Sequence, residues 1–527
     1  MALLLILPAS YPLIHECLTA APGRRATGFI QTDMPSYVAN ARQHFAGGFH
    51  LTYSNPYGEY GNMRAYFQPQ TLFLALLVRA GIDPAIAYHL FGFLAQCFAA
   101  LVAIRLYERF AGWHTLAHKI GLWCLFWGGG VLSLFGLALG HFMKLKPLFA
   151  AVALDPTEGW WMLNFGRNLV SPMEAYYHGL FLLAVLLAAQ KRFHWALFVC
   201  ALTSISHPFT GLSLIALLVA YSALELALRS GAASGTLLAG SVLVGMAHAG
   251  YYLVFLHRLP EHRAMQAQWL QEWYYPAWSL ACTTAIVGVL AFTRLTHWKV
   301  FKQEIAKPEI RLFLVWFGVI LALTQHDLVM KPIQPIHFAH GYDWLALFFL
   351  ALPALLPMLG KMTAIRQPVF RVAALSLFLA VMFSDNLLWF ATFQDHAIQH
   401  YAISVTPDEK DALTWLSAHS APQAMVLTSD ENLAYLTPTY TNLRSWYGHP
   451  LNTPYYTRRV NQVNAAFSAE RYLDAARPLY YVSVNSGTWH PPLNSRKVHS
   501  NKSFAIWFAP AADLKAAQSR KNMPPTP

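Results

Sequence analysis

The chain has 527 residues, 56% of them hydrophobic and only 12% charged, with a formal net charge of +12. Soluble domains carry about 25% charged residues, so this composition excludes an ordinary soluble protein and indicates a membrane protein with many spans. The positive charge does not indicate nucleic-acid binding, because Lys and Arg lie mostly between the apolar runs, where they set membrane topology. They also suit anionic lipid surfaces.

The first apolar run, residues 1–18, is short, contains two prolines and lacks a basic start, so we interpret it as a weak first span rather than a cleaved signal peptide. A long loop, 19–70, follows. Asp33, the one acid between residues 27 and 42, precedes a helix-like segment with Pro35 in its first turn, which is typical of a helix N-cap. The alternative interpretation places Asp33 at the outer surface of the bilayer, beside a lipid headgroup. Both interpretations stay open here.

Further apolar runs continue to about residue 394 and predict a domain of about eleven transmembrane helices over 1–394. The connections between them are of two alternating kinds. One set is short and rich in Lys and Arg, which is typical of cytoplasmic loops. The other set, which includes the loop 19–70, is longer, more aromatic and less basic. With an odd number of spans, the C-terminal region lies on the same outer side as Asp33. The spans predicted after the first run are 85–107, 120–141, 170–189, 195–206, 211–228, 236–256, 278–292, 312–323, 344–359 and 370–393.

From about residue 395 the composition shifts toward Pro, Asn, Ser and charged residues, and no stretch is long enough to cross a membrane. Residues 408–417 predict a short amphipathic helix, and three segments predict strands with turns between them. These segments are 424–429, 479–484 and 503–508. We therefore predict a small extracytoplasmic α/β domain over 395–514. Residues 515–527 are polar, end in prolines and are predicted to be disordered.

The first loop resembles that of bacterial members of the GT-C superfamily in the phrases TDMPSYVANARQHFAGGF and NPYGEYGNMRAYFQPQTLFLALLVRAG. The resemblance covers about residues 1–393. It implies a mainly α, polytopic fold and an inverting glycosyltransferase that takes a sugar from a polyprenyl-phosphate lipid donor. The acceptor would be a glycan, a lipid or a protein at the outer face of the bacterial cytoplasmic (inner) membrane, in the biosynthesis of cell-envelope glycans.

Such an enzyme needs a carboxylate that activates the acceptor hydroxyl, and Asp33 is the leading candidate for this base. A second acid would come from the next outer loop or from a span end, and the candidates are Glu174, Asp155 and Glu158. Glu174 could instead pair with Arg167 or His178, and the two loop acids could merely shape a turn. Members of the superfamily often carry an acidic pair that sometimes binds a divalent cation, Mg²⁺ or Mn²⁺. This chain has no Asp-x-Asp, so a metal cofactor stays open.

Cations and hydrogen-bond donors must hold the leaving phosphate, and aromatic side chains pack on the sugar and the lipid. The candidates in the predicted outer regions are Tyr37, Arg42, Arg167, His207, Arg263, Lys331, His337, Tyr342, Arg444 and Tyr447. Alternatives stay open for several. His207 could be a buried structural histidine, Lys331 an interfacial anchor, and 442–459 a surface loop rather than a lid or an acceptor site. The histidines near Lys331 do not have the spacing of a standard zinc site, so no metal site is assigned.

Two other functions compete with this one. A glycan polymerase or ligase that uses polyprenyl diphosphate donors would depend on Arg444, His207 or His337 more than on Asp33. A non-enzymatic transporter or assembly factor would favour repeat symmetry and ionisable groups near the bilayer centre, whereas these groups lie mostly at span ends here. The sequence contains no Gly-rich phosphate loop, Walker motif or nucleophile elbow, so a nucleotide-sugar donor is not supported.

Overall fold

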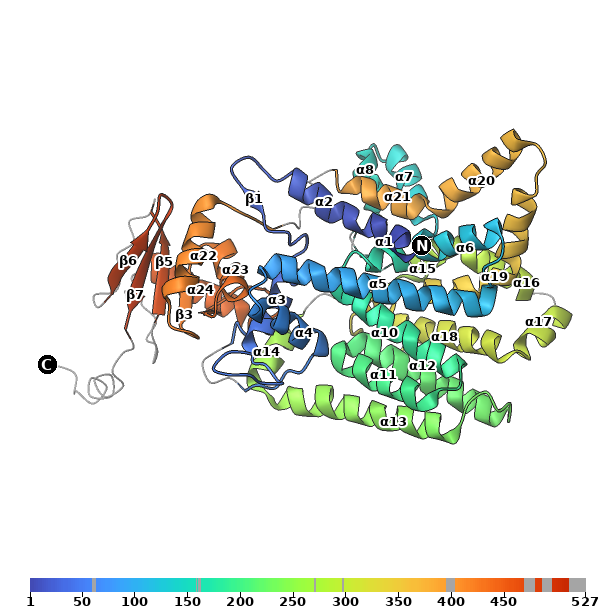
Figure 1. Cartoon of the computed structure of the whole chain (residues 1–527), viewed down its shortest axis with the longest axis horizontal. Helices are drawn as coiled ribbons and strands as arrows, with labels where there is room; N and C mark the ends of the chain where they lie inside the picture. The colour runs from blue at the N-terminus through green and yellow to red at the C-terminus, as the bar shows by residue number, and fades with distance from the viewer. Residues whose placement is uncertain are drawn as a thin grey trace. The chain divides into compact units, whose positions relative to one another are not determined.

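A computed structural model describes residues 1–58, 63–157, 159, 163–269, 272–295, 298–394, 403–468, 479–485 and 495–510. It is mainly helical, and its main sheet comes from the C-terminal part of the chain (Figure 1). The chain forms two compact units. The helical unit comprises Met1–His15, Leu90–Leu253 and Gln271–His400, and the loop unit comprises Glu16–His89, Val254–Leu270 and Tyr401–Pro527. The domain boundaries at 394 and 514 stay a prediction, and the predicted tail 515–527 lies outside the described residues.

Several of the longer helices begin at prolines, whose missing N–H would be unpaired at a helix start and whose fixed φ suits the helix. This holds for α5, α10, α12, α18 and α20. The helices up to α21, outside the first loop, are α1 (Ala2–Ile6), α2 (Tyr11–Leu18), α5 (Pro84–Ala111), α6 (Leu116–Trp127), α7 (Leu132–Phe142), α8 (Pro147–Val152), α9 (Phe165–Asn168), α10 (Pro172–Ala189), α11 (Phe193–Ser206), α12 (Pro208–Ala227), α13 (Gly235–Ala249), α14 (Pro260–Gln268), α15 (Ala277–Thr283), α16 (Ala285–Leu295), α17 (Trp298–Ile305), α18 (Pro308–Thr324), α19 (Tyr342–Thr363), α20 (Pro368–Met382) and α21 (Ser384–Thr392).

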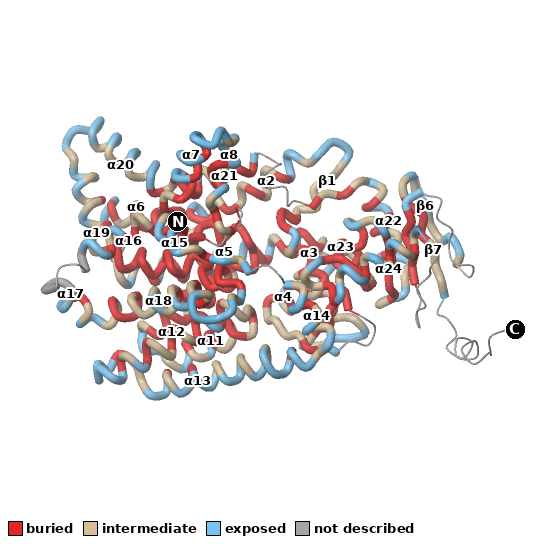
Figure 2. Tube along the Cα trace, turned by 180° about the vertical axis from the view of Figure 1, so that it is seen from behind, coloured by how far each residue is buried: buried red, intermediate tan, exposed pale blue. Residues whose placement is uncertain are grey.

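Among the described residues, five helices are long and apolar enough to cross a membrane: α5, α10, α12, the continuous stretch Gly235–Arg258, and α19. The number rises to seven if two bent helix pairs each form one span. The finer count of about eleven spans stays a prediction. Helices α13 and α20 keep large apolar side chains exposed, among them Leu243, Met246, Phe370 and Leu377 (Figure 2). Contiguous exposed apolar surface of this kind is expected where a helix faces lipid.

Two predicted spans, 120–141 and 370–393, are bent rather than continuous. The α6–α7 pair bends by 60° and the α20–α21 pair by 59°. The carboxylate of Asp385 accepts hydrogen bonds from the backbone N–H of Gly130 (3.0 Å) and of Ser133 (2.8 Å), and Asn386 donates to the carbonyl of Trp127 (2.7 Å). Backbone N–H and C=O groups at the break between α6 and α7 are therefore paired with side chains at the break between α20 and α21. An apolar environment requires such pairing. A Cβ at Gly130 would collide with the carbonyl of Cys282, so the break needs glycine there.

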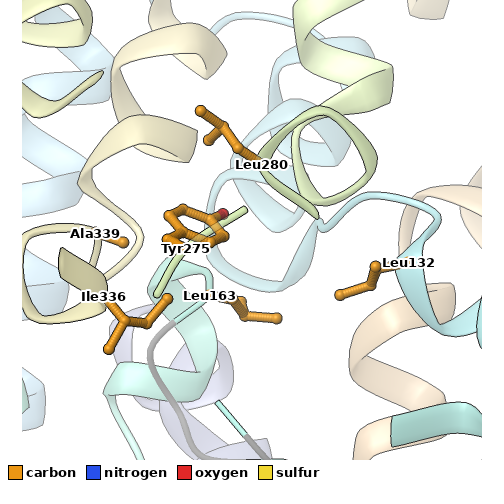
Figure 3. Close-up of a cluster of buried hydrophobic side chains, with 6 residues drawn as sticks. All are labelled: Leu132, Leu163, Tyr275, Leu280, Ile336 and Ala339. Atoms are coloured by element: carbon orange, nitrogen blue, oxygen red, sulfur yellow. The ribbon is translucent and has the colours of Figure 1, made fainter. Parts of the chain in front are cut away.

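Apolar side chains from four separate stretches of the chain fill the space around this break. They form a buried cluster of Leu132, Leu163, Tyr275, Leu280, Ile336 and Ala339 (Figure 3). The hydroxyl of Tyr275, the polar atom of this cluster, lies 2.7 Å from Oγ1 of Thr283, so burial does not leave it unpaired.

The sheet of the loop unit has five strands in the order β4-β3-β5-β7-β6. Strand β3 is parallel to β4 and β5, and β7 is antiparallel to β5 and β6. The helix and the three strands predicted between residues 408 and 508 are found at these positions. The bounds are α22 (Pro407–His419), β3 (Met425–Thr428), α23 (Glu431–Tyr440), β4 (Arg444–Ser445), α24 (Tyr456–Ser468), β5 (Leu479–Val484), β6 (Arg496–Ser500) and β7 (Phe504–Ala509).

The first loop is held against the start of this C-terminal segment. It carries β1 (Arg25–Ala26), α3 (Asp33–Gln43) and α4 (Pro69–Arg79), and β1 pairs antiparallel with β2 (Ser404–Val405). Arg24 donates to the carbonyl of Ser404 (2.6 Å) and to the carboxylate of Glu409 (3.3 Å). The chain therefore enters α3 from an anchored position.

The N-terminus of α22 is closed by a capping box. Thr406 accepts a hydrogen bond from the Glu409 N–H (3.1 Å), and the Glu409 carboxylate accepts one from the Thr406 N–H. We expect Thr406→Ala to destabilise this helix end by about 1 kcal/mol, because one of its first N–H groups loses its partner. Hydrogen exchange along α22 should become faster.

The matched control for this change is Thr414→Ala. The Thr414 hydroxyl donates to the carbonyl of Lys410 within the same helix (2.7 Å), so its loss should leave the exchange of α22 nearly unchanged. Equal exchange rates in the wild type and in Thr406→Ala would show that the box does not stabilise the helix.

Candidate functional site

Asp33 is the first residue of α3, and Thr32 occupies the N-cap position without a side-chain cap bond to any described residue. The prediction of an N-cap at Asp33 is therefore wrong. The reason is that its carboxylate has stronger partners than the first N–H groups of its own helix: it is turned toward a histidine from the C-terminal segment and toward Gln31.

Both oxygens of the Asp33 carboxylate accept hydrogen bonds. Oδ1 lies 2.5 Å from Nε2 of His449, and Oδ2 accepts from Nε2 of Gln31 at 2.9 Å. The side chain of Asp33 is nevertheless 38% exposed, whereas that of His449 is only 5% exposed. Tyr37, one helical turn further on, stacks on Tyr88 with ring centroids 6.4 Å apart. The carboxylate is thus held in one orientation and is still accessible from outside.

The proton of His449 can be placed from its hydrogen bonds. The backbone N–H of Leu451 donates to Nδ1 of His449 (3.1 Å), so Nδ1 is an acceptor and Nε2 carries the proton that is donated to Asp33. In this arrangement the imidazole is neutral. The ring lies edge-on to Tyr435 at 5.7 Å, and Tyr435 stacks on Tyr57 at 6.3 Å. Burial raises the pKa of the Tyr435 phenol, so this residue stays protonated.

A tight turn in the loop 442–459 presents His449 to Asp33. The N–H groups of Asn452 and Thr453 both donate to the carbonyl of His449, at 3.1 and 2.9 Å. The preceding Gly448 packs on the ring of Tyr57, where a Cβ would collide with the aromatic carbons. The aromatic, basic loop predicted as a lid or acceptor site thus supplies a partner for Asp33.

Most of the other predicted phosphate-binding residues of the loop unit bond to or pack against the unit itself. Arg444 is buried in β4 and donates to Ser54 (2.7 Å), Gln423 (2.8 Å) and the carbonyl of Asn55 (3.1 Å). Arg42 donates to the carbonyl of Thr439 (2.6 Å), and burial lowers its pKa to about 10. Tyr447 is buried against Tyr456, and Arg263 is exposed on α14. Because the guanidinium groups of Arg42 and Arg444 bond to the protein, we do not include them among the phosphate-binding residues.

In the helical unit, four predicted residues gather around His340. These are Glu174, His207, His337 and Tyr342. Oε2 of Glu174 lies 2.9 Å from Nδ1 of His340, and Nε2 of His340 lies 3.4 Å from Nδ1 of His337. The ring of His207 lies 5.7 Å from that of His340. The Glu174 carboxylate thus faces the loop before α19, and its charge also acts on His178.

Burial governs the charge of this cluster. His340 is fully buried, and burial lowers its pKa to about 3. It is therefore neutral near pH 7, and its Nδ1 lies beside the Glu174 carboxylate. His178 contacts the backbone carbonyls of Glu174 (2.8 Å) and His340 (2.7 Å), and Tyr342 stacks between the rings of His178 and Phe181. The cluster is a connected polar network enclosed by aromatic rings.

The remaining predicted residues lie apart from both groups. Arg167 and Asp155 form a buried ion pair at 3.1 Å, and Asp155 also accepts from the N–H of Thr157 (2.8 Å), as expected for a turn-shaping acid. Lys331 is exposed in the loop before η5 (Pro335–Phe338). Glu158 lies outside the described residues. Over the described ranges, no group of three or more His, Cys, Asp or Glu side chains is arranged to hold a metal ion.

Comparisons with known proteins return little at the level of sequence. No family model matches the chain, and no curated protein matches it. Among solved structures, the chain is similar to the crystal structure of ArnT from Cupriavidus metallidurans in the apo state. The identity is 13%, the match covers 96% of this chain and 97% of that one, and the TM-score is 0.42. At this identity and TM-score, the similarity does not extend to activity or to the roles of particular residues.

Proposed function

We propose that the chain is a membrane glycosyltransferase of the GT-C type, which moves a sugar from a polyprenyl-phosphate donor to an acceptor at the outer face of the bacterial cytoplasmic membrane. The observation that carries the proposal is the Asp33 carboxylate, which is hydrogen-bonded by His449 and Gln31 and still 38% exposed. The resemblance of the first loop to that of GT-C enzymes and the long apolar helices support the same assignment.

The proposed reaction is a single displacement. The acceptor hydroxyl donates its hydrogen bond to Asp33, and its oxygen attacks the anomeric carbon of the donor sugar. The bond between that carbon and the phosphate oxygen breaks, polyprenyl phosphate leaves with the electron pair, and Asp33 keeps the proton. Each carboxylate oxygen has two lone pairs, so the bonds from His449 and Gln31 leave acceptor capacity for the hydroxyl. A displacement of this kind inverts the anomeric configuration.

The proposal includes the predicted topology of about eleven spans with Asp33 and the C-terminal segment outside. The alternation of short basic and long aromatic connections supports this arrangement. The spans beyond the five long helices would come from the bent pairs and from shorter apolar helices such as α11. The step as written includes no metal ion, and the proposal assigns no role to Mg²⁺ or Mn²⁺.

A glycan polymerase or ligase is less well supported. Arg444, on which this function would depend, is buried, and its guanidinium bonds to Ser54, Gln423 and the carbonyl of Asn55. His207 and His337 belong to the cluster around His340 in the helical unit, and we propose for them the phosphate-binding role that the sequence suggests.

Replacement of His449 tests whether the hydrogen bond to Asp33 matters. We expect His449→Ala to lower kcat about ten- to hundredfold and to leave KM for the donor nearly unchanged, because the base loses its fixed orientation. His449→Gln, which keeps an N–H donor on a side chain of similar length, should recover part of the rate. The measurement is transfer of a labelled sugar by the purified protein.

The double variant with Asp33→Asn is the control. If His449 acts through Asp33, its replacement should cost nothing further once the carboxylate has been removed. A double variant whose loss in kcat equals the product of the two single losses would contradict the proposed role of His449.

A further inference from the structure

Helix α22 lines a small groove together with the end of α23 (Glu431–Tyr440). The groove has a volume of about 280 Å³ and is lined by Lys410, Leu413, Thr414, Ser417, Ala418 and Tyr440. The first five recur at intervals of three and four residues, which places them on one face of the helix. Tyr440 is the last residue of α23 and closes the groove from the other side. None of the residues proposed for sugar transfer lines it.

Lys410 supplies the positive charge among the residues that line the groove. The three acids near Lys410 on α22 are engaged elsewhere. Glu409 pairs with Arg24, and Asp408 accepts a hydrogen bond from Ser503. Asp411 accepts from Asn501 (2.9 Å) and His499 (2.8 Å), and these bonds lower its pKa. Lys410 is exposed and forms no ion pair with any residue that the structure describes. Its ammonium group lies 5.0 Å from the centroid of the Tyr440 ring.

The other lining groups suit a polyhydroxylated ligand. Burial raises the pKa of the Tyr440 phenol, with a further contribution from Asp83, so this hydroxyl stays protonated. The charge of Asp83 is in turn opposed by Arg42. The Thr414 hydroxyl donates to the carbonyl of Lys410 and keeps its lone pairs, and Ser417 is exposed one turn further on. A cation over an aromatic ring, three hydroxyls and the apolar side chains of Leu413 and Ala418 therefore surround one space.

We propose that this groove binds one anionic sugar unit, with its carboxylate or phosphate on Lys410, its ring on Tyr440 and its hydroxyls on Thr414 and Ser417. The volume of about 280 Å³ lies just below the range of small-molecule sites, about 300–1,000 Å³, which fits a single sugar ring better than a lipid chain or a peptide. Binding at this groove does not require sugar transfer, so it can be tested independently of the role of Asp33.

The test measures the binding of small sugars to the full-length protein in detergent by saturation-transfer NMR. The probes are glucuronic acid, glucose 1-phosphate, glucose and inorganic phosphate. We expect the two anionic sugars to bind more tightly than glucose, and Lys410→Gln to weaken them at least about tenfold, because a charge-assisted hydrogen bond is lost. Lys410→Arg should retain binding. Lys502→Gln, which removes an exposed lysine outside the groove, should bind as the wild type does.

Three results would overturn the proposal. Equal binding of glucose and glucuronic acid would show that charge is not recognised. Undiminished binding by Lys410→Gln would place the ligand elsewhere. Inorganic phosphate that competes as strongly as glucose 1-phosphate would show an anion site without sugar recognition. Asp33→Asn should bind these sugars normally, so a failure here is distinct from a failure of the proposed transfer reaction.

Discussion

Asp33→Asn should lower the rate of sugar transfer about 100- to 10,000-fold while leaving donor binding and the fold intact. The amide has nearly the shape of the carboxylate, and its one carbonyl oxygen can still accept the hydrogen bond from His449. It cannot take the proton of the acceptor hydroxyl. The loss should therefore appear in kcat, with KM for the lipid donor little changed. The measurement is a transfer assay with purified protein and a labelled polyprenyl-phosphate sugar.

Asp83→Asn is the matched control, since Asp83 is another acid in the same part of the chain. Its carboxylate accepts hydrogen bonds from the N–H groups of Ala85 (3.0 Å) and Ile86 (3.4 Å) at the start of α5, a role that asparagine also fills. This variant should retain activity. Full activity in Asp33→Asn would remove Asp33 from the mechanism.

Breaking the buried pair of Arg167 and Asp155 should cause the largest loss of stability. Their side chains are only 1% and 4% exposed, and Arg167 also donates to the carbonyl of Asp385 (2.7 Å) and to Asn386 (3.1 Å). In Arg167→Met the charge of Asp155 is left buried without its partner, which costs about 3–5 kcal/mol. The fraction of protein that stays folded after heating in detergent should fall accordingly.

A surface pair provides the comparison for this prediction. Arg105 and Glu108 are 2.9 Å apart, but the Arg105 side chain is 73% exposed. Arg105→Met should therefore change stability by less than about 1 kcal/mol. The double variant Arg167→Met with Asp155→Asn should recover part of the loss, because the uncompensated charge is gone. Equal stability of the wild type and Arg167→Met would contradict the buried pair.

The sequence predicts the fold class well because the signals are local. Long apolar runs and their basic flanks depend on neighbouring residues alone, and the strand 479–484 is found where its apolar, β-branched and aromatic residues predict it. The bends are different. The Gly128–Gly130 run marks one of them, but the partners that make it possible, Asp385 and Asn386, come from a distant helix pair.

The candidate site was predictable only in part for the same reason. Asp33 stands out as the one acid between residues 27 and 42, whereas His449 is separated from it by 416 positions and is one of 23 histidines. The sequence offers Arg167 and His178 as possible partners of Glu174 and does not indicate His340, which its carboxylate meets from another loop. Arg444 lies in a basic, aromatic loop that suggests ligand binding, and only the structure shows that its guanidinium is bonded to the protein.

The most direct test of the proposed transfer is mass spectrometry of the glycolipids and glycoproteins of the cell envelope, with and without the gene. Loss of the gene should remove one sugar from an envelope acceptor and cause the matching polyprenyl-phosphate sugar to accumulate. Wild-type protein should restore both masses, and Asp33→Asn should restore neither. Identical envelope glycans and lipid-linked sugars in the two strains would contradict a glycosyltransferase.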